Sequence, residues 1–90
     1  MLKVLLIDDE ERATDVLRRM IEKFIPEIKQ VQACNDARKA LTIIHSMQPD
    51  LIFLDIRMPH FSGFDILDKL PNKNFKIIFV KNIRLPIVLI

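Results

Sequence analysis

Residues 51–59, Leu-Ile-Phe-Leu-Asp-Ile-Arg-Met-Pro, carry the clearest structural signal in this 90-residue chain. Four apolar residues lead directly into Asp55, and turn-forming pairs bound the run at Pro49-Asp50 and Met58-Pro59. A short apolar run with such borders is typical of a strand that is buried on both faces. Asp55 stands where this strand ends, which is where ligands bind in an open parallel sheet. A capping or turn role for Asp55 is the alternative.

A second apolar run, residues 3–7, also ends in acids, first Asp8 and Asp9 and then two glutamates. If the two strands are parallel neighbours, Asp8, Asp9 and Asp55 converge at one edge of the sheet. Three carboxylates in a partly dry pocket repel one another, and a hard divalent cation such as Mg²⁺ relieves that repulsion. The alternative is that these acids only begin a helix, because acids favour its N-terminal end.

The remaining pattern alternates strands with helices. Apolar runs predict strands at 2–7, 28–33, 51–55 and 75–80, and helical periodicity predicts helices at 12–25, 37–47 and 64–70. Strand 28–33 alternates apolar and polar residues, which favours an edge position, and Asp36 is a candidate N-cap. The helices are expected to turn inward Ala13, Val16, Leu17, Met20, Ile21, Phe24, Phe64, Leu67 and Leu70. Because each helix can serve as a crossover, the prediction is an α/β doubly wound parallel sheet.

Composition narrows the class of protein. Ninety residues that are 50% apolar indicate one globular domain. We expect no membrane span, no signal peptide and a cytoplasmic location, where the single Cys34 stays reduced. The formal net charge of +2 is too small to indicate nucleic-acid binding.

The sequence resembles the receiver domain of bacterial two-component response regulators over residues 1–80. The resemblance rests on Ile7-Asp8-Asp9-Glu10, on Leu54-Asp55-Ile56-Arg57-Met58-Pro59 and on Gly63 after it. Residues 75–80 look most similar to the LytTR class of these regulators. The resemblance implies a flavodoxin-like fold with strand order 2-1-3-4 and three helices, incomplete after the fourth strand.

The resemblance also implies a function. Asp55 would accept a phosphoryl group from a sensor histidine kinase, so the chain would be a signalling domain and not an enzyme. Asp9 would bind Mg²⁺ directly, Asp8 would help through water, and Asp55 and the main-chain carbonyl of Arg57 would supply further oxygens. Gly63 would adopt a backbone conformation that other residues avoid. A third possible function is that of a Mg²⁺ phosphohydrolase with Asp55 as nucleophile. Such enzymes usually have a second Asp two residues later as general acid, and Arg57, which stands there, cannot take that role.

The sequence departs from the family near its end. Lys81 stands where the family has Thr or Ser, and it either contacts the phosphoryl group or is a solvated turn residue. Residues 81–90 form an apolar and basic tail, expected to pair with the fourth strand as an antiparallel edge strand or with another chain. The alternative function is therefore a degenerate receiver that acts as an interaction or dimerisation module. In neither case do we expect DNA binding by this chain alone.

Overall fold

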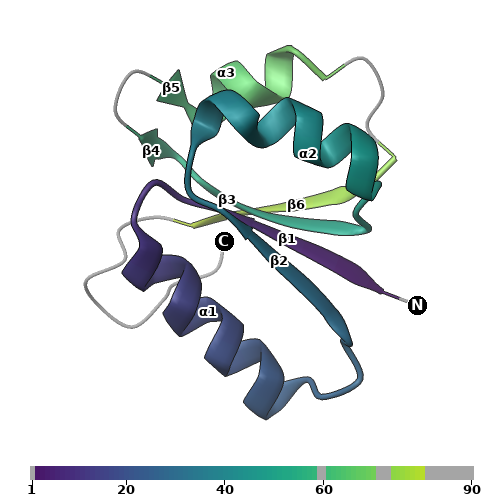
Figure 1. The fold of residues 1–90 in the computed structure, drawn as a ribbon. Helices are drawn as coiled ribbons and strands as arrows, with labels where there is room; N and C mark the ends of the chain where they lie inside the picture. The colour runs from purple at the N-terminus through teal and green to yellow at the C-terminus, as the bar shows by residue number, and fades with distance from the viewer. Residues whose placement is uncertain (1, 59–60, 71–73, 81–90) are drawn as a thin grey trace.

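A four-stranded parallel sheet with helices on both faces organises this computed structural model, which describes residues 2–58, 61–70 and 74–80 (Figure 1). Its strands are β1 (Lys3–Ile7), β2 (Gln30–Cys34), β3 (Leu51–Asp55) and β6 (Lys76–Val80). They lie in the order β2-β1-β3-β6, and every neighbouring pair is parallel. The predicted doubly wound sheet, its order and the edge position of β2 are therefore confirmed.

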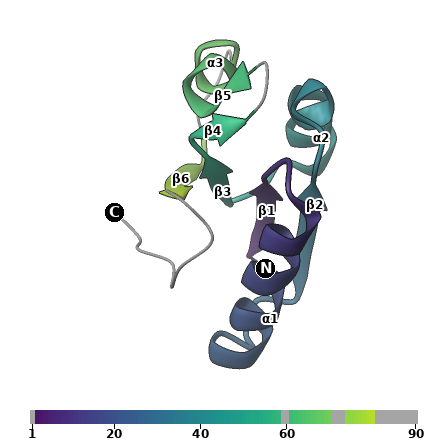
Figure 2. The same ribbon diagram turned by 90° about the vertical axis from the view of Figure 1, so that its left-hand side faces the viewer.

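Three α-helices connect the strands. Helix α1 (Glu11–Phe24) packs on one face of the sheet, and α2 (Ala40–Met47) and α3 (Gly63–Asp68) pack on the other, as Figures 1 and 2 show. The second predicted helix begins as a 3₁₀ turn, η1 (Ala37–Lys39), which is common at helix N-termini, and the Asp36 carboxylate caps this turn by accepting from the Arg38 N–H. The loop expected after β3 contains two short antiparallel strands, β4 (Arg57–Met58) and β5 (Phe61–Ser62).

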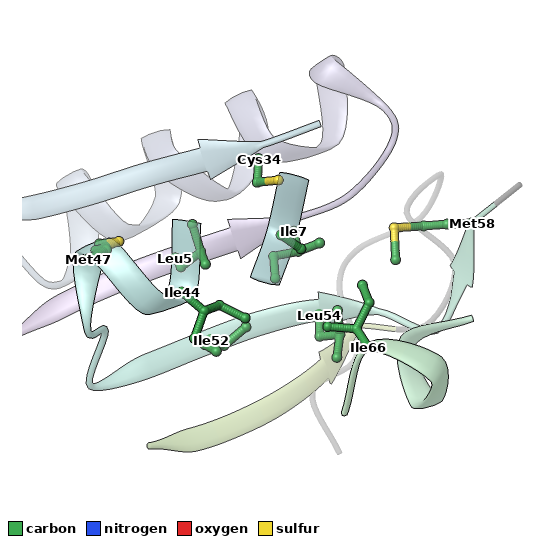
Figure 3. Packing of buried hydrophobic residues seen from close by; sticks show 10 residues of the cluster. Leu5, Ile7, Cys34, Ile44, Met47, Ile52, Leu54, Met58 and Ile66 are labelled. Carbon is green, nitrogen blue, oxygen red and sulfur yellow. The ribbon is translucent and has the colours of Figure 1, made fainter. Parts of the chain in front are cut away.

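Successive strand residues point to opposite faces, so the sheet has two apolar layers. One layer joins the strands to α1, and its buried members are Val4, Leu6, Leu17, Ile21, Ile28, Phe53 and Val80. The other joins them to α2 and α3 (Figure 3), and its members are Leu5, Ile7, Cys34, Ala40, Ile44, Met47, Ile52, Leu54, Met58 and Ile66. Strands β1 and β3 contribute to both layers, which explains their near-continuous apolar sequence.

Four residues expected to point inward do not. On α1, Val16, Met20 and Phe24 are 49%, 41% and 68% exposed, whereas Ala13, Leu17 and Ile21 are buried. The apolar residues of α1 therefore cover a wider part of the helix surface than the part that packs against the sheet. On α3, Phe64 is 52% exposed, and its ring stacks on Phe79 of β6 at 5.2 Å between centroids. Ile66 takes the inward position of α3 instead.

Two further expectations concern a membrane span and the C-terminal tail. None of the helices in the described ranges is both long enough and apolar enough to cross a membrane. The predicted tail at 81–90, including Lys81 and the C-terminal edge strand, lies outside the described residues.

Candidate functional site

Three carboxylates meet at the end of the sheet where β1 and β3 finish. The parallel register pairs Ile7 with Leu54, so Asp8 and Asp55 are the next residues on two adjacent strands. One carboxylate oxygen from each of Asp8, Asp9 and Asp55 lies within 4.8 Å of the others. The structure thus brings together the three acids that strand-end positions alone suggested as a group. We call these three residues the acid cluster.

Asp8 is the buried member with the most unusual surroundings. It is 2% exposed, its Oδ1 accepts a 2.9 Å hydrogen bond from the Glu10 N–H, and its Oδ2 is buried without a hydrogen-bond partner among the described residues. The pKa of Asp8 is raised from the ordinary 3.8 to about 7, chiefly because the carboxylate is buried. The Glu10 N–H opposes this shift, and the negative charges of Asp55 and Asp9 contribute to it.

The other two acids differ in exposure. Asp55 is 5% exposed at the end of β3, and Asp9 is exposed in the turn between β1 and α1. The cluster therefore opens to solvent on the side of Asp9 while Asp8 and Asp55 are held by the sheet. This arrangement gives a cation a route from water to two fixed carboxylates.

The chemistry of these groups fits a hard divalent cation. Carboxylate oxygens are the ligands that Mg²⁺ prefers, and Mg²⁺ commonly keeps several waters beside one or two carboxylates. The buried Asp8 Oδ2 lacks a donor among the described residues, and leaving such an atom unsatisfied is unfavourable. A cation would satisfy it and would remove the repulsion among the three charges.

Gly63 supports the acid cluster through its small size. A Cβ atom at this position would lie 2.8 Å from the Asp55 carbonyl oxygen and 3.1 Å from Leu54 Cγ. The expectation of a special backbone conformation at Gly63 is wrong, because its φ is not positive. What the site requires is a close approach: the Gly63 N–H donates to the Ile56 carbonyl at 3.0 Å, which draws the start of α3 against the end of β3.

Two further predicted site residues are Arg57 and Lys81. Arg57 begins β4, two residues after Asp55, and its position pairs with Ser62 of β5. The use of its main-chain carbonyl as a metal ligand stays a prediction. Lys81 falls outside the described residues, so its predicted phosphate contact also stays a prediction.

Sequence reasoning missed one residue beside the acids. Asn35, directly after β2, donates from Nδ2 to the Asp8 carbonyl at 2.9 Å and to Thr14 Oγ1 at 3.0 Å. A single polar residue directly after a strand gives no periodic signal. Its contact is visible only once β2 and β1 are known to be adjacent.

Comparison with known proteins agrees with this geometry. The family model described as "response regulator receiver domain" matches residues 4–83. Among curated proteins, the transcriptional regulatory protein BtsR of Salmonella typhi is 40% identical over 70 residues, covering 78% of this chain and 29% of that protein. An uncharacterized response regulatory protein of Yersinia pestis is 40% identical over 82 residues, covering 89% of this chain and 34% of that protein. The chain therefore spans about a third of the length of these relatives.

Solved structures show the same fold. The response regulator domain of Thermotoga maritima CheB superposes with a TM-score of 0.78 at 28% identity, covering 90% of this chain and 60% of that one. The MaeR response regulator bound to beryllium trifluoride gives a TM-score of 0.82 at 23% identity, covering 90% of this chain and 67% of that one. At that lower identity the likeness to MaeR concerns the fold alone.

Proposed function

This chain belongs to the family of response regulator receiver domains, and on that premise we propose that it accepts a phosphoryl group on Asp55 from a sensor histidine kinase in a Mg²⁺-dependent reaction. The observation that carries the proposal is the acid cluster, in which Asp8, Asp9 and Asp55 place oxygens within 4.8 Å of one another. The predicted kinase partner and cytoplasmic location are parts of the same proposal.

Each acid has a separate task in the proposed reaction. Asp55 is the nucleophile: one of its oxygens attacks phosphorus while the bond from phosphorus to the donor's imidazole nitrogen breaks, and the electron pair of that bond stays with the imidazole. Asp9 would hold the cation directly and Asp8 would help through water, and Asp55 and the Arg57 carbonyl would supply further oxygens. When bound, Mg²⁺ supplies positive charge against the phosphoryl oxygens and the carboxylates.

The position of Asp55 suits it to this role. Phosphoryl transfer depends mainly on positioning and on charge neutralisation, so a weak nucleophile on a rigid element is sufficient. Asp55 is the last residue of β3, whose neighbours β1 and β6 hold it on both sides. Its backbone is further fixed by the close approach of Gly63.

Intact-mass spectrometry after incubation with acetyl phosphate and Mg²⁺ tests the proposal. We expect a gain of one phosphoryl group that disappears in EDTA and in Asp55→Asn. The matched control is Asp68→Asn, which removes an exposed carboxylate at the end of α3, outside the acid cluster. It should be phosphorylated like the wild type.

The proposal would be overturned if the protein gained no mass while its backbone-amide NMR spectrum showed that it was folded. The chain would then be a receiver-derived scaffold, and the interaction or dimerisation role expected as the alternative would replace phosphotransfer. Equal phosphorylation of Asp55→Asn would instead place the acceptor on another residue.

A further inference from the structure

One amide group joins the end of β2 to the segment that carries two of the three acids. Asn35 Nδ2 donates to the carbonyl oxygen of Asp8 at 2.9 Å and to Thr14 Oγ1 at 3.0 Å. Asp8 lies in the β1–α1 connection, and Thr14 lies in α1, one turn after its start. The two hydrogen bonds therefore link three separate parts of the chain through a single side chain.

The chemistry of the partners fixes the orientation of this amide. A main-chain carbonyl can only accept, so the nitrogen of Asn35, and not its oxygen, must face Asp8. The Thr14 hydroxyl donates to the Glu11 carbonyl at 3.0 Å, which leaves its oxygen to accept from Asn35. Thr14 is 2% exposed, so its hydroxyl is held in this geometry by the surrounding structure. Each of these three hydrogen bonds thus pairs a donor with an acceptor.

Both main-chain polar groups of Asp8, its N–H and its carbonyl, form hydrogen bonds with the end of β2 or with the residue after it. The Asp8 N–H donates to the Cys34 carbonyl at 3.1 Å, which continues the ladder between β1 and β2. The Asp8 carbonyl, one step further along, has no strand partner to accept from, because β2 has ended at Cys34. Asn35 supplies that missing donor. Without it, the ladder would stop before the peptide bond that joins Asp8 to Asp9.

We propose that Asn35 is a positioning residue that sets the orientation of Asp8 and Asp9 for divalent-cation binding, acting through the Asp8 carbonyl and the Thr14 hydroxyl. The identity of the cation, Mg²⁺, rests on the proposed function. Rotation of the Asp8–Asp9 peptide would move both carboxylates relative to Asp55. Groups that orient metal ligands without touching the metal commonly change metal affinity 10- to 100-fold when they are removed.

Removal of this side chain should act locally. Asn35 is an exposed residue beside a groove that Arg12, Thr14 and Arg18 also line, so its truncation leaves no cavity in either apolar layer. A loss of cation affinity without a comparable loss of global stability is therefore the expected signature. A residue that only stabilised the fold would lower stability throughout the molecule.

The first test measures Mg²⁺ affinity by titration of backbone amide shifts in Asn35→Ala, with Gln32→Ala as the control. Gln32 is an exposed amide on β2, the strand that Asn35 follows, and no hydrogen bond of its side chain is found among the described residues. We expect the dissociation constant to rise about tenfold in Asn35→Ala and to stay at the wild-type value in Gln32→Ala. Equal affinities in the two variants would overturn the proposal.

The second test does not require metal. In Mg²⁺-free buffer, the hydrogen-bonded amides of Glu10, Ala13 and Thr14 should exchange with solvent about tenfold faster in Asn35→Ala, while those of β1 and β3 stay as protected as in the wild type. If the wild type binds no Mg²⁺, the proposed function fails, and this exchange pattern still decides the role of Asn35. Faster exchange everywhere, or nowhere, would overturn it.

A matched pair at Thr14 separates the hydrogen bond from packing. Thr14→Val keeps the shape of the side chain and removes the hydroxyl, so it should reproduce part of the Asn35→Ala effect on exchange and affinity. Thr14→Ser keeps the hydroxyl, so its amide exchange and its Mg²⁺ affinity should match those of the wild type. If Thr14→Val behaved like the wild type, the second arm of the proposed link would be wrong.

Discussion

When it is ionised, Asp8 should destabilise the metal-free protein, and the features responsible should also favour the proposed function. Its carboxylate is 2% exposed, one of its oxygens lacks a donor among the described residues, and two further carboxylates lie beside it. Ionising such a group without a cation is unfavourable. The same features favour cation binding, because a divalent ion would replace the missing donor and neutralise the repulsion.

The raised pKa of Asp8 predicts an unusual pH dependence in metal-free solution. The pKa is about 7 in the folded protein and near the ordinary 3.8 in the unfolded chain, so the folded state holds this proton more tightly. The contribution of Asp8 to stability is therefore greatest below about pH 4, falls as pH rises toward 7, and stays low above that. The shift sets an upper bound of about 4 kcal/mol on this loss.

Urea unfolding in EDTA between pH 4.5 and 7.5 measures this effect. The wild type should lose stability as the pH rises, and Asp8→Asn, which has no proton to lose, should show a much flatter profile. The half-buried Asp36, whose pKa is lowered by its hydrogen bonds with Arg38, acts at a pH below this window. Parallel profiles for the two proteins would show that Asp8 ionises normally.

Single residues differ in how far the sequence predicts them. Asp8, Asp9 and Asp55 were predictable because each follows an apolar strand directly, and strand ends meet in a parallel sheet. Asn35 was not, because its importance comes from a contact across 27 positions of sequence. Gly63 was correctly singled out for a wrong reason, since the structure needs its missing Cβ and not a positive φ.

Helix α1 shows where periodicity fails at the scale of an element. Six apolar residues follow helical spacing, but three of them, Val16, Met20 and Phe24, are exposed. Successive residues are about 100° apart around a helix, so Val16 and Leu17 cannot both face the sheet directly. The periodicity predicts that α1 has an apolar stripe and where its centre lies. How much of that stripe the sheet covers depends on tertiary packing, which the periodicity does not predict.

The two sides of α1 should respond differently to truncation. Leu17 is 5% exposed within the apolar layer between α1 and the sheet, so Leu17→Ala should lower the free energy of unfolding by about 2–4 kcal/mol. Val16 is 49% exposed, and Val16→Ala should change it by less than about 0.5 kcal/mol. Urea titrations of both variants measure the difference. A large loss in Val16→Ala would mean that this side of α1 is covered in solution.

At the scale of the whole molecule, the alternation of strands and helices predicted a parallel sheet without predicting its order. Parallel neighbours need crossovers, and each predicted helix could provide one. The order β2-β1-β3-β6 followed only from the family resemblance, because burial alone does not distinguish which apolar strands are adjacent. That order matters for function, because it makes β1 and β3 neighbours and so assembles the acid cluster.

Because the acid cluster exists only when β1 and β3 are paired, cation binding should stabilise the whole fold. A ligand that binds only the native state stabilises it by mass action. At a free Mg²⁺ concentration about ten times the dissociation constant, the gain is about 1.4 kcal/mol, which corresponds to a rise in Tm of about 6–11 °C for a domain of this size. Calorimetry with and without Mg²⁺ measures it.

Asp8→Asn should reverse this balance between stability and binding. At pH 7.5 without Mg²⁺ the variant should melt at a higher temperature than the wild type, because a buried negative charge beside two others has been removed. With Mg²⁺ it should gain little, since an amide is a weaker ligand and one charge fewer attracts the ion. Asp68→Asn, outside the acid cluster, should keep the wild-type response. An Asp8→Asn protein that is less stable than the wild type in both conditions would show that Asp8 serves the fold and not the cation.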